Sequence, residues 1–175
     1  MNSITPETGS ITSRVSVPVA VMLEKRKSQG KFWTQYSWHL VKVLVGEHLA
    51  LGSDSYGGVK VADTDTGEQY LWSGFRVTLY RDACERYWHA LIGDKPLVYV
   101  VCREDEADGG DEPALVTIDY DEAIAHGETD AKVLSTDIPA ELYQLMETFV
   151  LDNYKPTEFK KRKRKNWNGE ESKRG

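Results

Sequence analysis

Residues with nucleophile and base chemistry gather in the segment 81–92, which holds Cys84, Glu85 and His89. A cysteine and a histidine act together only within hydrogen-bonding reach, with a third group orienting the base. The apolar spacing of the segment predicts a helix, and five residues along a helix turn the chain by about 500°. Cys84 and His89 therefore point in different directions, while Glu85 and His89 form an ordinary polar pair on a helix surface. We expect a protein that is not an enzyme; a site assembled from distant segments is the alternative.

Other residues that could bind metals or phosphates are scattered along the chain. The acidic segment 104–112 lacks the ligand spacing of a calcium loop. Cys84 and Cys102 lie in different segments, which is typical of small buried thiols in a reducing compartment. Gly57 and Gly58 open no helix, so they do not form a phosphate-binding loop. We expect no metal and no cofactor. The alternative is a metal site assembled from separated histidines, which are His39, His48, His89 and His126.

Six consecutive cations near the C-terminus are the strongest charge feature. From Lys155 to Gly175 there are 9 basic and 3 acidic residues, whereas the preceding part of the chain has 13 basic and 25 acidic ones. Such a run repels itself, stays disordered alone and binds polyanions, and a nearby tryptophan can stack on a base. A solubilising tail, or one neutralised by the acidic body, is the alternative. The predicted polyanion-binding residues are Lys160, Lys161, Arg162, Lys163, Arg164, Lys165 and Trp167.

A strand predicted over 70–80 carries aromatic residues and an arginine on one face. Strict alternation places Tyr70, Trp72, Arg76 and Tyr80 on that face, and Leu71, Phe75, Val77 and Leu79 on the other, with Gly74 in the middle. Tryptophan and tyrosine beside arginine are typical of protein-binding surfaces. Residues of these types also line sheets covered by a helix. We therefore predict a partner-binding surface at the first four residues, with core packing as the alternative.

The remaining pattern favours strands first and helices inserted late. Alternation from Val15 to Leu23 predicts a strand, with Pro18 indicating an edge strand or a bulge, and a polar loop follows over 24–31. Further strands are expected near 36–45, 59–62, 97–102, 114–118 and 133–134, helices over 81–92 and 139–153, and one or two helical turns over 119–126. This order predicts an α+β fold, a mostly antiparallel sheet or partly open barrel with two main helices. Leu142, Leu145, Met146 and Phe149 should pack as one stripe against the sheet.

Length and composition are those of one globular domain. The chain has 175 residues, of which 40% are hydrophobic and 29% charged. We expect a disordered lead-in over 1–13, a single α+β domain over 14–154 and a basic disordered tail over 155–175. No stretch reaches the roughly 18 apolar residues that span a bilayer, and residues 1–13 have no features of a secretory signal. We therefore expect no membrane partner and a cytoplasmic location.

Several motifs resemble those of one bacterial family of unknown function. They are Tyr70-Leu71-Trp72-Ser73-Gly74-Phe75, then Leu79-Tyr80-Arg81-Asp82 with Glu85 and Tyr87, the strand 96–103, Val116-Thr117-Ile118-Asp119-Tyr120 with Glu122-Ala123, Ile138-Pro139 and Tyr154-Lys155-Pro156. The resemblance covers about residues 15 to 160. Members of the family are often encoded beside formate dehydrogenase and molybdenum-cofactor accessory genes.

The resemblance implies a non-catalytic accessory or assembly factor, with another protein as its partner. The implied partner system is a molybdenum-dependent formate dehydrogenase. A nucleic-acid-binding protein that acts through the basic C-terminal tail is the alternative function.

Overall fold

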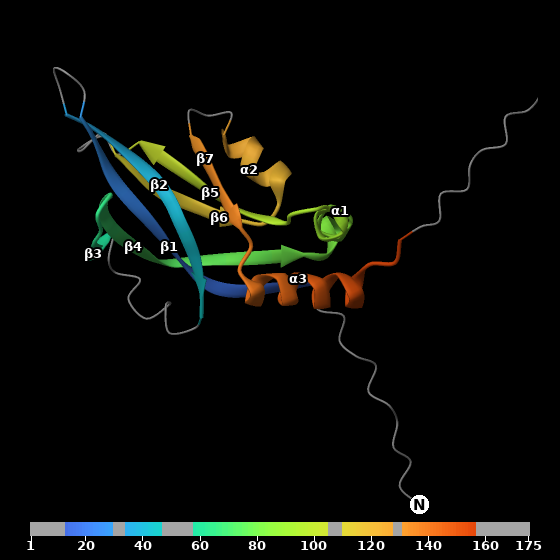
Figure 1. The fold of residues 1–175 in the computed structure, drawn as a ribbon. Coiled ribbons are helices and arrows are strands. Elements are labelled where there is room, and N and C mark those ends of the chain that lie inside the picture. The colour runs from blue at the N-terminus through green and yellow to red at the C-terminus, as the bar shows by residue number, and fades with distance from the viewer. Residues whose placement is uncertain (1–12, 30–33, 47–57, 105–109, 128–130, 157–175) are drawn as a thin grey trace, which may run out of the picture.

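The computed structural model describes residues 13–29, 34–46, 58–104, 110–127 and 131–156 (Figure 1). These residues form a sheet of strand order β2-β1-β4-β3 and a second of order β6-β5-β7, with all neighbours antiparallel. The predicted α+β class is confirmed, and the arrangement is open rather than a closed barrel. The elements are β1 (Arg14–Gln29), β2 (Thr34–Val45), β3 (Val59–Asp63), β4 (Gly67–Tyr80), η2 (Arg81–Ala83), α1 (Cys84–Ile92), β5 (Leu97–Glu104), β6 (Asp111–Thr117), α2 (Tyr120–Gly127), β7 (Lys132–Asp137) and α3 (Ala140–Asn153).

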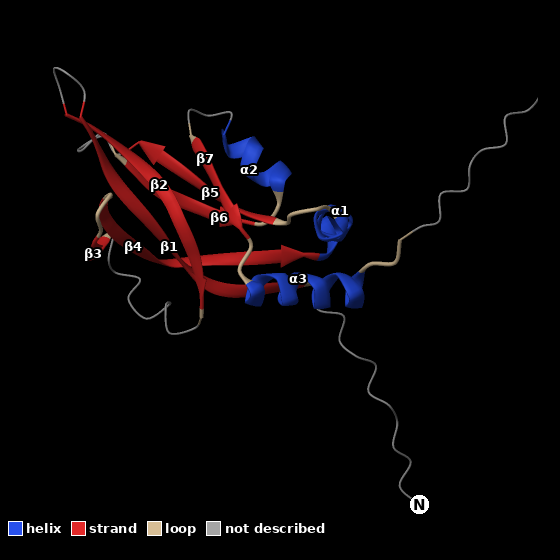
Figure 2. Ribbon diagram, viewed as in Figure 1, coloured by secondary structure: helices blue, strands red, loops and turns tan. Residues whose placement is uncertain are grey.

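The helices are placed at two positions around the sheets. Figure 2 shows α1 and α3 near the end of β4, where they pack against each other, and α2 beside the second sheet. α2 has eight residues, about two turns, which agrees with the one or two turns expected over 119–126. Its Ala123 is fully buried against the strands. The first sheet therefore has an inner face, toward the second sheet and α3, and an outer face directed away from them.

The predicted loop over 24–31 is wrong at its start, because β1 continues to Gln29. Lys25, Arg26 and Lys27 stay paired with β2, opposite Trp38, Ser37 and Tyr36. The Lys25 ammonium lies 4.6 Å from the centre of the Tyr36 ring, so aromatic side chains on β2 accommodate its charge. A polar sequence can thus continue a strand when its partner strand offers such contacts.

β1 is the second strand of its sheet rather than an edge, so the edge alternative drawn from Pro18 is wrong. The bulge alternative is wrong for β1 as well, because the β1–β4 register shifts between Val19 and Val21 through an extra residue on β4. Pro18 is tolerated because the ladder to β2 ends one residue later, at Val19 and Val45. The Pro18 carbonyl accepts a hydrogen bond from the Gly46 N–H at 3.1 Å, so the missing proline N–H costs one bond at the end of a ladder.

The bulge lies in β4 and changes which face each residue occupies. Val19 pairs with Phe75 while Val21 pairs with Trp72, so β4 advances three residues where β1 advances two. The extra residue sits beside Gly74, whose φ of 89° suits glycine and strains other residues. Alternation is therefore reversed on the two sides of Gly74.

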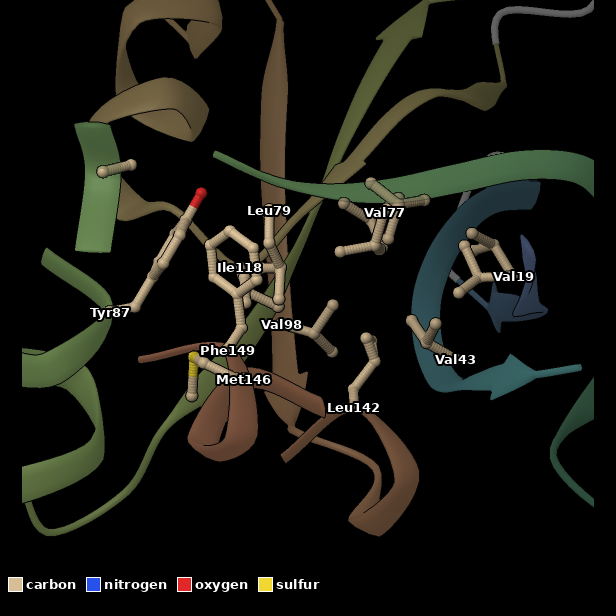
Figure 3. Close-up of a cluster of buried hydrophobic side chains, with 14 of the residues drawn as sticks. Val19, Val43, Val77, Leu79, Tyr87, Val98, Ile118, Leu142, Met146 and Phe149 are labelled. Atoms are coloured by element: carbon tan, nitrogen blue, oxygen red, sulfur yellow. The ribbon is translucent and has the colours of Figure 1, made fainter. Parts of the chain in front are cut away.

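The core lies between the inner face of the first sheet, the second sheet and α3 (Figure 3). Leu142, Met146 and Phe149 project from α3 toward strand residues that include Val77 and Val98, and Leu145 is partly buried beside them. The predicted stripe on the last helix is confirmed. Cys84 and Cys102 are buried and unpaired, as expected, and burial raises the pKa of the Cys102 thiol to about 12.

Candidate partner-binding surface

The bulge divides the four predicted partner-binding residues between two faces. Tyr70 and Trp72 lie on the inner face, because they pair with Leu23 and Val21, and Trp72 is only 8% exposed. Trp38 packs edge-on against both, at ring-centre distances of 5.4 and 5.5 Å. The prediction of one shared face is wrong, and for Tyr70 and Trp72 the packing alternative holds.

Close packing around Trp72 supports a structural role for this aromatic cluster. A Cβ atom at Gly58 would lie 2.6 Å from the Trp72 ring, so only a glycine fits against the indole there. The Tyr70 hydroxyl donates a hydrogen bond to Glu68 at 2.9 Å, and Glu68 also accepts one from Lys60 at 2.6 Å. These contacts satisfy the Tyr70 hydroxyl from within the chain, whereas the buried Trp72 indole N–H has no hydrogen-bond partner among the described residues.

Arg76 and Tyr80 lie on the outer face and keep the exposure that a binding surface requires. Tyr80 is 45% exposed and pairs with Arg14 of β1. The Arg76 side chain is exposed and reaches across the neighbouring strand β1. Its Nε donates to Ser16 Oγ at 2.9 Å and its Nη2 to the Ser16 carbonyl at 3.1 Å. We call this surface the outer arginine face; it comprises Arg14, Ser16, Arg76, Thr78, Tyr80 and the following residue, Arg81.

The outer arginine face has a local excess of positive charge on an acidic protein. Among the described residues, no carboxylate lies within ion-pair distance of Arg14, Arg76 or Arg81. An open hollow of about 570 Å³ adjoins the face and is lined by Ser13, Arg14, Tyr80, Arg81 and Asp82. Asp82 is the one acid among the described residues of that lining, so two guanidinium groups outweigh it there.

Sequence reasoning missed Arg14 and Arg81 as members of this surface. Arg14 is the first residue of the predicted domain, and Arg81 is the first residue of the helix predicted over 81–92. The antiparallel register brings Arg14 opposite Tyr80, and the Arg81 N–H donates to the Ser13 carbonyl at 3.1 Å. The signal available in the sequence was the continuation of β1 alternation back through Ser16 to Arg14, but only the pairing of β1 with β4 turns that signal into a surface.

A second polar region joins α1 to the start of α2. The Arg86 guanidinium holds the buried Asp119 with two parallel hydrogen bonds, Nε to Oδ1 at 3.0 Å and Nη2 to Oδ2 at 2.6 Å. Asp119 Oδ1 also accepts from the Asp121 N–H at 3.1 Å and so caps α2. A cavity of about 390 Å³ lies beside this pair, with Lys95 also in its lining. Asp119 and Asp121 balance Arg86 and Lys95, so the cavity has no net charge to attract an ion.

The residues weighed for catalysis do not converge. Cys84 is buried while His89 is exposed, and His89 packs edge-on against Trp88 at 4.9 Å. Burial raises the pKa of the Cys84 thiol, which disfavours the reactive thiolate.

Within the described ranges, no group of three or more potential ligands is arranged to hold a metal ion. No helix of the described part is long and apolar enough to cross a membrane.

The predicted tail site, which extends from Lys160 to Lys165 with Trp167, lies outside the described residues, as does the lead-in up to residue 12.

No curated protein and no solved structure matches the chain. A family model does match, over residues 18–163, and its description is a protein of unknown function, DUF3305. That span covers most of the 175 residues, so the chain belongs to the DUF3305 family.

Proposed function

We propose that this protein is a non-catalytic accessory or assembly factor that binds a partner protein through the outer arginine face. The observation that carries the proposal is the exposed grouping of Arg76, Tyr80 and Arg14 without any neutralising carboxylate among the described residues. Arginine and tyrosine dominate the binding energy of protein interfaces, because each combines a large contact area with directional hydrogen bonds. An unpaired arginine is also free to meet an acidic group on a partner.

The partner that we propose is a molybdenum-dependent formate dehydrogenase or a protein that inserts its cofactor. The support is the resemblance of the sequence motifs to a family encoded beside such genes. A cytoplasmic location belongs to the same proposal. It is supported by Cys84 and Cys102, both free and buried, which suit a reducing compartment.

A pull-down from the native host tests the proposal. The tagged wild type should recover formate dehydrogenase subunits or cofactor-insertion proteins, and a double variant, Arg76→Gln with Tyr80→Ala, should recover much less of them. The matched control is Tyr36→Ala, because Tyr36 is 54% exposed but lies on β2. Recovery that is equal for wild type and the double variant, or lost in the control, would contradict the assignment of the surface. Recovery of ribosomes or nucleic acid alone would contradict the function.

The second candidate function is nucleic-acid binding through the C-terminal tail. Six consecutive cations, Lys160 to Lys165, favour it, and the rest of the chain opposes it by its negative charge. Binding to phosphates releases counterions, so the affinity should fall steeply with salt. Deleting residues 160–165 should abolish binding to a single-stranded oligonucleotide at low salt. Unchanged binding after the deletion excludes the tail as the binding element.

A further inference from the structure

We propose that the cavity between α1, β5 and α2 binds a free amino acid with an aromatic side chain, held as the zwitterion. The cavity shares no residue with the outer arginine face, so the inference goes beyond the proposed function and does not depend on it. Its volume is about 390 Å³, and it lies between α1, the start of β5 and the start of α2. That volume is toward the lower end of the range for small-molecule sites, which suits a compact ligand with one ring.

The charged groups of the lining come in opposite pairs. Arg86 and Lys95 are positive, Asp119 and Asp121 are negative, and with His89 counted as neutral the formal charges cancel. A ligand with a net charge gains little from such a lining, whereas a molecule with both signs can meet a group of each sign. An α-amino acid at neutral pH carries an ammonium and a carboxylate close together, so it has both signs and no net charge.

Two of these four charged groups are committed to the fold and two are available to a ligand. Asp119 is buried, and it accepts hydrogen bonds from the Arg86 guanidinium and from the Asp121 N–H, which fixes the start of α2 against α1. Lys95 is exposed and has no ion pair among the described residues. The Asp121 side chain is 71% exposed, and its one ion pair in the described part of the chain is long, at 3.7 Å to Arg86 Nε. Lys95 can therefore bind the ligand carboxylate, and Asp121 the ligand ammonium.

The rest of the lining favours an aromatic side chain on the ligand. Tyr99 and Tyr120 meet edge to face, with ring centres 5.6 Å apart and an angle of 61° between the ring planes. Pro96, Leu97 and Ile118 add apolar surface to the same cavity. Tyr120 is 58% exposed, so it has ring surface left to bury. A phenyl ring that packs against these tyrosines gains an aromatic contact in addition to the burial of its apolar area.

Isothermal titration calorimetry on the purified full chain tests the inference with four probes. Phenylalanine has all three features of the ligand, whereas phenethylamine lacks the carboxylate, hydrocinnamate lacks the ammonium and alanine lacks the ring. Phenylalanine should bind roughly tenfold more tightly than each of the others, because each omission removes a charge-assisted hydrogen bond or the buried ring. Lys95→Gln should abolish the preference for phenylalanine over phenethylamine and keep that over hydrocinnamate. Asp121→Asn should do the reverse, because each variant removes the partner of one ligand charge.

The control variant is Lys42→Gln, which removes an exposed lysine of β2 that also has no ion pair among the described residues. It should leave all four affinities unchanged, and thermal unfolding should show that the three variants fold. No binding of phenylalanine, equal affinity for phenylalanine and any one of the other probes, or the same loss in Lys42→Gln would overturn the inference. So would variants of Lys95 and Asp121 that weaken all probes alike, because the two residues would then not be the partners of the two ligand charges.

Discussion

The buried carboxylate of Glu24 should make the stability of the protein depend on acid in a way that one substitution removes. Glu24 is 3% exposed and lies on β1 beneath the turn between β3 and β4. Thr64 Oγ1 donates to Glu24 Oε1 at 2.7 Å, Arg26 Nε donates to Oε2, and Thr66 Oγ1 donates to Oε1 at 3.0 Å. The hydrogen bond from Thr64, and then that from Arg26, lower the Glu24 pKa from 4.5 to about 2.

The direction of the effect follows from the lowered pKa. The folded state keeps Glu24 ionised where the unfolded chain binds a proton, so its stabilisation is complete above pH 4.5 and is lost as the pH falls toward 2. The full difference corresponds to about 3 kcal/mol, of which about 2 kcal/mol is lost by about pH 3. Other acids also titrate in this range. The comparison of wild type with Glu24→Gln cancels them, because glutamine keeps the shape and cannot ionise.

Urea unfolding at a series of pH values measures the effect. The free energy of unfolding of the wild type should exceed that of Glu24→Gln near neutral pH, and the difference should shrink by about 2 kcal/mol on going to about pH 3. Glu85→Gln is the matched control, since Glu85 is exposed and has no ion pair among the described residues. A wild-type advantage over Glu24→Gln that stays constant across this range would refute the assignment of the low pKa to Glu24.

Three further predictions concern the fold. Phe149→Ala removes a buried ring from α3 and should lower the free energy of unfolding in urea by about 3–5 kcal/mol. Deletion of residues 157–175 should leave the melting temperature almost unchanged. A deletion that lowers the melting temperature as much as Phe149→Ala does would show that the tail is docked on the body. Gly74→Val places a β-branched residue at a φ of 89° and should destabilise by about 1–3 kcal/mol, while Gly93→Ala, at a φ of −74°, should cost less. Cys84 and Cys102 should react with a disulfide reagent only after unfolding, and fast labelling of the native protein would contradict their burial.

Patterns with a fixed period could be predicted well from the sequence. The stripe Leu142, Met146 and Phe149 is buried, because a helix with one apolar face has to cover it. Most strands were also predicted close to their observed ends, since alternation of apolar and polar residues continues wherever one face is buried. In both cases the evidence is local to one element.

What could not be predicted depends on pairing between distant segments. Strict alternation placed Trp72 and Arg76 on one face, and a single extra residue at Gly74 separated them. The same pairing brought Arg14 beside Tyr80 across more than sixty positions of sequence. The alternation within each strand does not reveal the register between β1 and β4. Half of the predicted surface was therefore assigned to the wrong face, and Arg14 and Arg81 of the outer arginine face were missed.

The double pairing of β1 also has a consequence for the order in which the chain folds. β1 and β2 are joined by a short connection and can pair as soon as both have left the ribosome. Val15 pairs with Leu79, so the other edge of β1 waits for the synthesis of β4. Closing a loop of about 60 residues costs more entropy than closing a hairpin, and such distant pairings slow folding. Until β4 arrives, the nascent hairpin presents a long free edge to neighbouring chains, which makes this interval the one most exposed to aggregation.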